Sequence, residues 1–246
     1  MKQLKYAIPL LLTSFASQAA LVDLSTWMTD GEGSWSVSAD NNTANQSVNG
    51  DPTVFYSTGS SLGQTISGEF SVGTENDDDF IGFVLGYNAG EINSATSDFL
   101  LVDWKQADQV HPELGTASAG LAISQVSQGL NYDTGAWEHD PTMGVTELAR
   151  SINYAETGWE DNTIYSFDIT FTAELVEVFI NDIKELSISG EFTDGGFGFY
   201  NFSQPDVQYS QVMADEAPPV GVSEPTTVLL WGAGLAAVFL RRKQKQ

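Results

Sequence analysis

An all-β sandwich is the fold class that this sequence predicts, and three observations support it. Apolar and polar side chains alternate along several short runs, which is the pattern of half-buried strands. Turn signals rich in Gly, Asn, Asp and Pro separate these runs at intervals of about eight to twelve residues. No run in the body of the chain keeps a helical hydrophobic period for more than about two turns. Short antiparallel strands joined by turns are therefore expected to pack as two facing sheets.

In the first half of the body, predicted strands follow clear turns. Residues 27–48 predict short strands and a polar loop, and Asn49-Gly50-Asp51-Pro52 is a turn signal before the strand 53–57. Residues 65–72 predict a longer strand. In Phe80 to Tyr87, glycines alternate with bulky residues, so one face of this strand is expected to meet another backbone or a ligand closely.

The second half continues with predicted strands at 100–104 and 120–126, whereas residues 128–149 are irregular. From residue 158 the alternation becomes clean, as expected for antiparallel strands with one buried face. These later strands are predicted at 165–173, 175–181, 183–188, 195–203 and 207–213.

Charge and cysteine content exclude several kinds of site. The chain has no cysteine and only His111 and His139, which excludes thiolate metal sites and argues against a histidine-built zinc site. The body contains only Lys105, Arg150 and Lys184 as basic residues, against nearly all of the 33 acids. Such a surface repels phosphate backbones, so nucleic acid is not an expected partner. Hard cations or high-salt surroundings suit such a surface better.

The N-terminus has the three parts of a secretory signal peptide, residues 1–19. Lys2 and Lys5 precede the apolar run 6–12, and a polar-to-small region ends at Ala19. We expect cleavage there and export of the body, residues 20–213. A buried N-terminal strand or helix is the alternative.

The C-terminus predicts a second targeting segment, residues 222–246. Its apolar run 228–240 would rise only about 20 Å as a helix, against a hydrocarbon core of roughly 30 Å. The segment resembles the PEP-CTERM sorting signal, which an exosortase recognises, although Ser223 stands where the motif usually has its first proline. The matching residues are the motif Val222, Glu224, Pro225 and Thr226 and the basic tail Arg241, Arg242 and Lys243.

This resemblance implies a precursor held in the membrane by its C-terminal helix, cleavage near the motif, and delivery to the Gram-negative cell envelope or its extracellular matrix. The acidic, Pro-rich linker 214–221 would hold the body away from the signal. The basic residues after the short span would hold the C-terminus in the cytoplasm and leave the body outside. An uncut tail anchor is the alternative to cleavage.

Two motifs suggest catalysis by their spelling but lack the context it needs. Gly59-Ser60-Ser61-Leu62-Gly63 matches G-x-S-x-G, but a strand follows it where a nucleophile elbow needs a helix. Glu138 and Asp140 form a Glu-x-Asp pair of the kind that flanks a glycosidic bond. No second Glu is placed to complete an acid/base set, so solvated loop acids are the preferred interpretation.

Four segments, taken together and in this order, resemble the thrombospondin C-terminal domain. The resemblance implies a lectin-like jelly-roll sandwich over the body. Asp98 stands where that family has a basic residue, and the calcium-binding repeats that precede the domain in animal thrombospondins are missing, so receptor recognition is not transferred. The segments are NDDDFIGFVLGY at 76–87, DFLLVDWKQ at 98–106, GWEDNTIYSF at 158–167 and GFGFYNFSQ at 196–204.

Asp77, Asp78 and Asp79 are the candidate metal ligands. On the residues alone, three adjacent carboxylates before a strand are typical of a solvated loop. The resemblance implies a calcium-dependent region here, and hard cations take carboxylate oxygens from such loops. Both interpretations stay open, and the loop 88–97 after the strand is the other candidate functional segment.

Together these features predict a noncatalytic, calcium-assisted adhesion or binding module displayed on the cell surface. Exopolysaccharide or another surface protein is the expected partner. Trp104 and Trp159 would suit stacking on sugar rings if exposed, but large aromatics are mostly buried, so we expect both in the core. A polysaccharide-cleaving enzyme of lectin-like fold and a purely structural coat protein are the rival functions.

Overall fold

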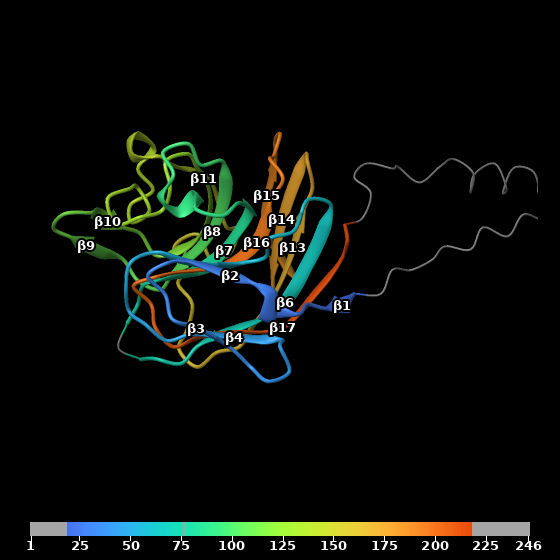
Figure 1. The fold of residues 1–246 in the computed structure, drawn as a ribbon. Helices are drawn as coiled ribbons and strands as arrows, with labels where there is room; N and C mark the ends of the chain where they lie inside the picture. Colours follow the sequence, from blue (N-terminus) through green and yellow to red (C-terminus); the bar gives the residue numbers. More distant parts are fainter. Residues whose placement is uncertain (1–18, 76, 218–246) are drawn as a thin grey trace, which may run out of the picture.

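A computed structural model describes residues 19–75 and 77–217. The expected sorting segment 222–246 and all but Ala19 of the expected signal peptide lie outside these residues. Two antiparallel sheets face each other and enclose the core between them (Figure 1). Within the described ranges, no helix is both long and apolar enough to cross a membrane.

One sheet has seven strands and carries the candidate acidic segment at the start of β7. Its central strands β8, β7 and β16 are buried along their whole length, which explains why they read as nearly continuous apolar runs. In spatial order, the strands are β12 (Val145–Arg150), β11 (Gly120–Val126), β8 (Phe99–Lys105), β7 (Phe80–Tyr87), β16 (Gly196–Phe202), β5 (Thr53–Tyr56) and β2 (Met28–Gly31).

The other sheet has eight strands, and its side chains alternate between the core and the solvent. Strand β13 is the clearest case, because its burial alternates at every residue. In spatial order, the strands are β15 (Ile183–Ser189), β14 (Leu175–Ile180), β13 (Tyr165–Phe171), β6 (Gln64–Val72), β17 (Val207–Glu216), β4 (Thr43–Gln46) and β3 (Trp35–Val37), with β1 (Ala20–Leu21) paired to β17.

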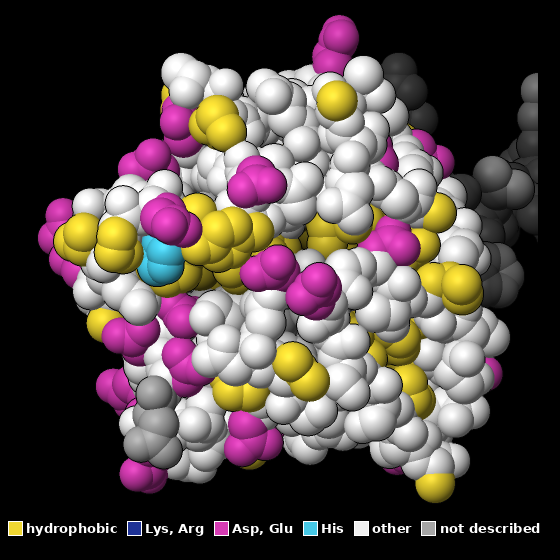
Figure 2. Space-filling model, turned by 60° about the vertical axis from the view of Figure 1, so that its left-hand side comes forward, with side chains coloured by type: hydrophobic (Ala, Val, Ile, Leu, Met, Phe, Trp, Pro, Cys, Tyr) yellow, Lys and Arg dark blue, Asp and Glu magenta, His cyan; other side chains and the backbone are white. Residues whose placement is uncertain are grey.

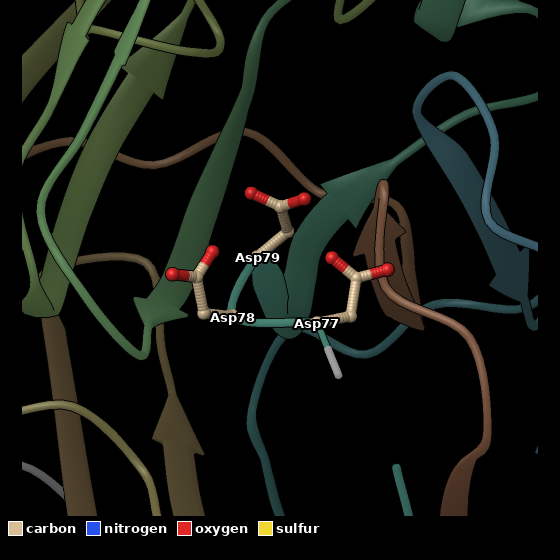
Figure 3. A group of neighbouring side chains, drawn as sticks. All are labelled: Asp77, Asp78 and Asp79. Carbon is tan, nitrogen blue, oxygen red and sulfur yellow. The ribbon is translucent and has the colours of Figure 1, made fainter. Parts of the chain in front are cut away.

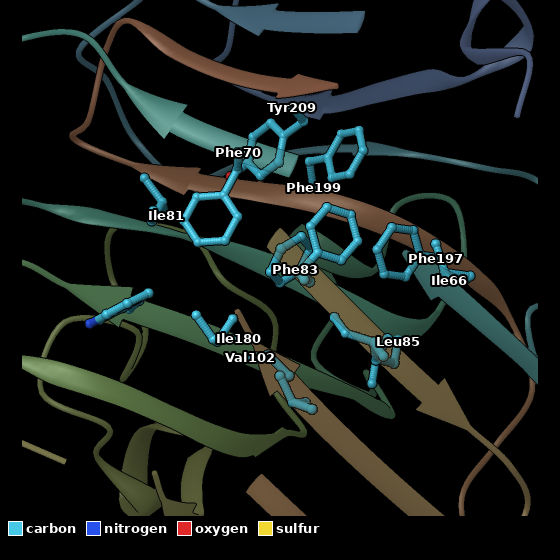
Figure 4. Packing of buried hydrophobic residues seen from close by; sticks show 14 of the residues in the cluster. Ile66, Phe70, Ile81, Phe83, Leu85, Val102, Ile180, Phe197, Phe199 and Tyr209 are labelled. Carbon is cyan, nitrogen blue, oxygen red and sulfur yellow. The ribbon is translucent and has the colours of Figure 1, made fainter. Parts of the chain in front are cut away.

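Aromatic residues from both sheets fill the space between them (Figure 4). Phe83 of β7 and Phe167 of β13 pack with ring centroids 4.6 Å apart, and Phe199 of β16 stacks on Tyr209 of β17 at 4.2 Å. Trp104 and Trp159 are buried, which confirms their assignment to the core. Large aromatic side chains contribute much of the apolar area that a cysteine-free domain must bury.

Three details differ from the sequence prediction. β12 is a strand where an irregular segment was expected, because it pairs with β11 from Ala122 to Val126. β17 continues to Glu216, so residues 214–216 of the expected linker belong to the sheet, paired with β6. A small hairpin of β9 (Gln109–His111) and β10 (Gly115–Ala117) follows β8.

Two sheet edges on the same side of the sandwich are joined. The amide of Ile152, just after β12, donates to the carbonyl of Glu185 in β15 at 3.0 Å. The buried Glu185 carboxylate accepts from the Ser151 hydroxyl at 2.6 Å and from the backbone N–H of Asn153 at 2.8 Å. This side chain therefore fixes the chain leaving β12 against the edge strand β15.

Loops cover the outer face of the seven-stranded sheet and form a second core there. In the loop 88–97, the short 3-10 helix η2 (Glu91–Asn93) buries Ile92 against this face. The Glu91 carboxylate accepts from the backbone N–H groups of Asn88 and Asp98, at 2.6 and 3.1 Å. The loop is thus a packed cover for the sheet, held by its own hydrogen bonds.

Candidate functional site

The three acids that the sequence singled out converge at the entrance to β7. One carboxylate oxygen from each of Asp77, Asp78 and Asp79 lies within 4.8 Å of the others. Figure 3 shows the three side chains projecting toward the same side of the segment. Asp79 is 3% exposed, whereas Asp77 and Asp78 are half-buried. The three carboxylates therefore lie close enough together for a shared cation to contact all of them.

A basic side chain of the protein already contacts this cluster. The side chain of Lys105, at the end of β8, is fully buried, and its ammonium lies 2.7 Å from Asp79 Oδ1. It also donates to the carbonyl of Asp78 at 2.9 Å and to Gln109 Oε1 at 2.9 Å, with Asp78 Oδ1 at 3.4 Å. Two ring faces complete its surroundings, because Phe80 and Trp137 lie 5.3 and 5.1 Å from Nζ.

Asp77 lies on the part of the cluster that Lys105 does not contact. Burial raises the pKa of Asp77 to about 6, the neighbouring Asp79 carboxyl adds to the rise, and a hydrogen bond from Asn49 opposes it. At neutral pH the Asp77 carboxylate is therefore charged although burial and the neighbouring Asp79 disfavour the charged form. A cation placed beside Asp77 would stabilise its charged form.

Sequence reasoning missed a second buried charge cluster on the outer face of the same sheet. His139 Nε2 lies 2.9 Å from Asp103 Oδ2, and its Nδ1 lies 3.1 Å from Glu147 Oε2. Burial alone would lower the pKa of His139, but the two carboxylates outweigh it and raise the pKa to about 10. His139 is therefore an imidazolium at neutral pH. It fastens the covering loop 127–144 to β8 and β12.

The sequence held one signal for this cluster. Asp103 interrupts the apolar end of strand β8, and a buried carboxylate requires a charged or hydrogen-bonding partner. Its partner lies 36 residues away in an irregular loop. His139 also has a positive φ of 52°, which strand and helix periodicity do not register.

The residues that matched catalytic motifs are engaged in other contacts. The Ser61 hydroxyl donates to the Gly195 carbonyl at 2.9 Å, and Ser61 is buried. Asp140 accepts from the Thr142 N–H at 2.8 Å and caps the 3-10 helix η3 (Pro141–Met143). Glu138 accepts a longer bond of 3.4 Å from the Thr116 N–H. Each of these bonds orients a turn or loop, which is a structural role.

Comparison with known proteins places this architecture in a family. Residues 30–216 match the family model of the thrombospondin C-terminal region. The chain belongs to this family. Thrombospondin-1 of Xenopus laevis is 28% identical over 183 residues, and thrombospondin-2 of Bos taurus is 29% identical over 186 residues. Each alignment covers 68% of this chain but 15% of the relative, so this thrombospondin C-terminal domain corresponds to a small part of those proteins.

Solved structures confirm the lectin-like sandwich predicted for this thrombospondin C-terminal domain. The carbohydrate-binding module CBM66 from Bacillus subtilis superposes with a TM-score of 0.55 at 10% identity, covering 77% of this chain and 95% of that one. The exoplasmic/lumenal domain of VIP36, in its Ca²⁺/Man3GlcNAc-bound form, superposes with a TM-score of 0.56 at 12% identity, covering 86% and 95%. At these identities the likeness establishes the fold.

Proposed function

We propose that this protein is a noncatalytic, extracellular glycan-binding module. The observation that carries the proposal is the sandwich itself. A thrombospondin C-terminal domain here has the fold of a carbohydrate-binding module and of the VIP36 exoplasmic/lumenal domain in its Ca²⁺/Man3GlcNAc-bound form. Exopolysaccharide is the proposed partner, and a glycan-bearing surface protein would present the same chemistry.

The test is a binding assay with the full chain on immobilised polysaccharides and a glycan array. Saturable binding without release of reducing ends supports the module. Release of reducing ends that disappears in Glu138→Gln or Asp140→Asn would establish the polysaccharide-cleaving alternative instead. Absence of binding to every glycan tested, together with ordered self-assembly, would favour a structural coat protein instead.

Export and sorting form a second part of the proposal. The signal peptide 1–19 and the tail 222–246 support secretion, processing by an exosortase, and delivery to the surface of a Gram-negative cell. The mass of the protein recovered from the envelope tests this directly. We expect a mature chain without residues 228–246, whereas a mass that retains them would show an uncut membrane anchor.

Calcium assistance is proposed at Asp77, Asp78 and Asp79. Three facts support it: the convergence of the carboxylates, the charge on Asp77 that Lys105 does not contact, and the Ca²⁺-bound forms of VIP36. Extracellular calcium modules bind with Kd values of about 10⁻⁴ to 10⁻³ M. A hundredfold excess over Kd would add about 2.7 kcal/mol to the free energy of unfolding.

Thermal unfolding in Ca²⁺ and in chelator measures this effect. The expected rise in Tm is about 5 to 10 °C for a domain of this size. Asp77→Ala should remove most of the rise, and Glu174→Ala, in the turn between β13 and β14, should leave it intact. An unchanged Tm in the wild-type chain would retire the calcium proposal without affecting the glycan assay.

A further inference from the structure

A polar cavity of about 650 Å³ opens beside the first part of β11, and its lining includes none of the three clustered acids. This volume falls within the range of roughly 300–1,000 Å³ that is usual for small-ligand sites. It is framed by the turn after β8, the residues before β11, the end of β12 and the loop that follows β12. The lining residues are Asp108, Ser118, Ala119, Arg150, Ala155 and Glu156.

Arg150 is held rigidly in this cavity. Its Nη1 donates to the carbonyls of Ala119 and Ala155, at 2.9 and 3.0 Å. Its Nε donates to Glu147 Oε1 at 3.2 Å, and Nη2 lies 2.9 Å from Glu147 Oε2. A guanidinium has five N–H groups, so one N–H of Nη2 remains available. The side chain is 27% exposed, which leaves that donor accessible to a ligand.

Acceptors accompany this donor. Asp108 is exposed and uses Oδ1 to accept from the Ala119 N–H at 2.7 Å, which fixes its carboxylate while leaving Oδ2 available. Glu156 is exposed, and its carboxylate has no hydrogen-bond partner among the residues that the structure describes. Ser118 adds an exposed hydroxyl. The cavity therefore offers one oriented donor among several free acceptors.

The charges in and around the cavity restrict its ligand. Glu147 already neutralises Arg150, and Asp108 and Glu156 add negative charge, so a carboxylate or phosphate ligand would be repelled. Elsewhere on the surface, the face shown in Figure 2 carries many acidic side chains and no visible Lys or Arg, so the protein as a whole repels polyanions. A metal cation would find no group of three converging carboxylate or imidazole ligands here among the described residues. A neutral molecule that both donates and accepts hydrogen bonds satisfies all of these groups.

We propose that this cavity binds a neutral sugar residue of a polysaccharide. Adjacent hydroxyls donate to the Asp108 and Glu156 carboxylates, and a hydroxyl or ring oxygen accepts from Arg150. The inference rests on the glycan-binding function proposed above and specifies its place and its ligand class. Among the residues that the structure describes, no aromatic ring lines the cavity, so hydrogen bonds dominate and uncharged polysaccharides are selected over acidic ones.

Affinity electrophoresis of the full chain tests the site, with dextran, mannan and inulin as neutral probes and alginate as the acidic one. Glu156→Gln removes a free carboxylate, and Ser118→Trp fills the cavity from an exposed position. Each should weaken binding to the preferred neutral probe by about tenfold or more, Glu156→Gln through the loss of hydrogen bonds to a charged group and Ser118→Trp by steric exclusion of the sugar. Glu174→Gln is the matched control, because Glu174 is exposed and its carboxylate is also unpartnered within the described residues, in the turn between β13 and β14.

The possible outcomes separate the two proposals. Neutral-probe binding that both cavity variants weaken and the control retains supports the site. Equal binding by wild type, Glu156→Gln and Ser118→Trp would overturn the cavity while leaving a glycan-binding module. Preference for alginate would overturn the neutral-ligand assignment. Absence of binding to any glycan would remove the function on which the site depends.

Discussion

Lys105 and Arg150 are two of the three Lys and Arg residues in an acidic body, and their environments differ in one decisive respect. The Lys105 ammonium is fully buried, and protein oxygens and aromatic faces surround it. Arg150 is fixed by two carbonyls and a carboxylate, yet it borders a cavity and keeps a free N–H. All the contacts of Lys105 are therefore within the protein, whereas Arg150 is held in place but still has one N–H that a ligand can accept from.

This contrast follows from the cost of burying charge. A buried ammonium must have its lost hydration replaced by the protein, and removing one partner leaves an uncompensated charge in the interior. A guanidinium at a surface cavity keeps part of its hydration, so it contributes less to the free energy of unfolding than a fully buried ammonium does. Its free N–H can exchange water for a ligand. Mutations at the two positions should therefore affect different measurements.

The largest expected effect is that of Lys105→Met. The substitution keeps the volume of the side chain but leaves the buried Asp79 carboxylate unpaired, which should cost about 3–5 kcal/mol of the free energy of unfolding. Chemical denaturation measures this loss. Lys184→Met is the control, because Lys184 is 46% exposed and pairs with Glu177 at the surface, so a change below about 1 kcal/mol is expected.

The same variant bears on calcium. Once the ammonium is gone, a divalent cation can take the oxygens that it occupied, so Ca²⁺ should recover part of the stability lost in Lys105→Met. A loss of stability no larger than that of Lys184→Met would contradict the assignment of Lys105 as a committed structural cation.

His139→Gln should give an intermediate effect with a defined pH dependence. The pKa of His139 is raised from 6.5 to about 10, so the charged ring contributes its full stabilisation below pH 6.5 and loses it as the pH rises through about 10. The variant should therefore be less stable by roughly 3 kcal/mol at pH 6. Urea unfolding between pH 6 and pH 10.5 should show this difference shrinking.

His111→Gln is the matched control for that titration. The Nδ1 of His111 accepts from the Glu113 backbone N–H at 3.3 Å, and no carboxylate binds its ring within the described residues. The change in its free energy of unfolding should be small compared with that of His139→Gln. A difference for His139→Gln that grew toward pH 10 would have the wrong sign and would exclude a charged His139.

The smallest expected effect is that of Asp77→Asn. Removing this charge relieves repulsion with Asp79, so in chelator the variant should be more stable by up to about 1 kcal/mol, or about 2–4 °C in Tm. In saturating Ca²⁺ the order should reverse, because the wild type gains a bound ion that the variant holds poorly. If Asp77→Asn is the more stable of the two proteins both with and without Ca²⁺, the three acids have a structural role only.

Much of the fold could be predicted because its information is local. β7 and β11 begin and end where the sequence predicts, since each is a short apolar run between turn residues. β12 could not be found in this way, because half of its residues are exposed and only Val145 is fully buried. Its existence depends on pairing with β11, which is a tertiary property.

The candidate site was predictable only in part, for a similar reason. The three adjacent acids were visible as a cluster, whereas Lys105 reads as the polar end of a strand. Its contact with Asp79 spans 26 residues, and only the pairing of β7 with β8 creates it. The Arg150 cavity depends on three separate segments that no sequence motif connects. Contacts between charged residues that are far apart in the sequence are therefore the part of the candidate site that could not be predicted.

The link between the end of β12 and strand β15 has a consequence for crowding. An exposed edge strand offers unpaired backbone groups to neighbouring molecules and is a common starting point for aggregation. Here the Ile152 amide occupies a carbonyl of that edge, and the buried Glu185 carboxylate anchors the crossing chain. Part of the β15 edge is thus already occupied by the protein's own backbone. Copies packed densely beside one another have correspondingly less opportunity to join into a continuous sheet there.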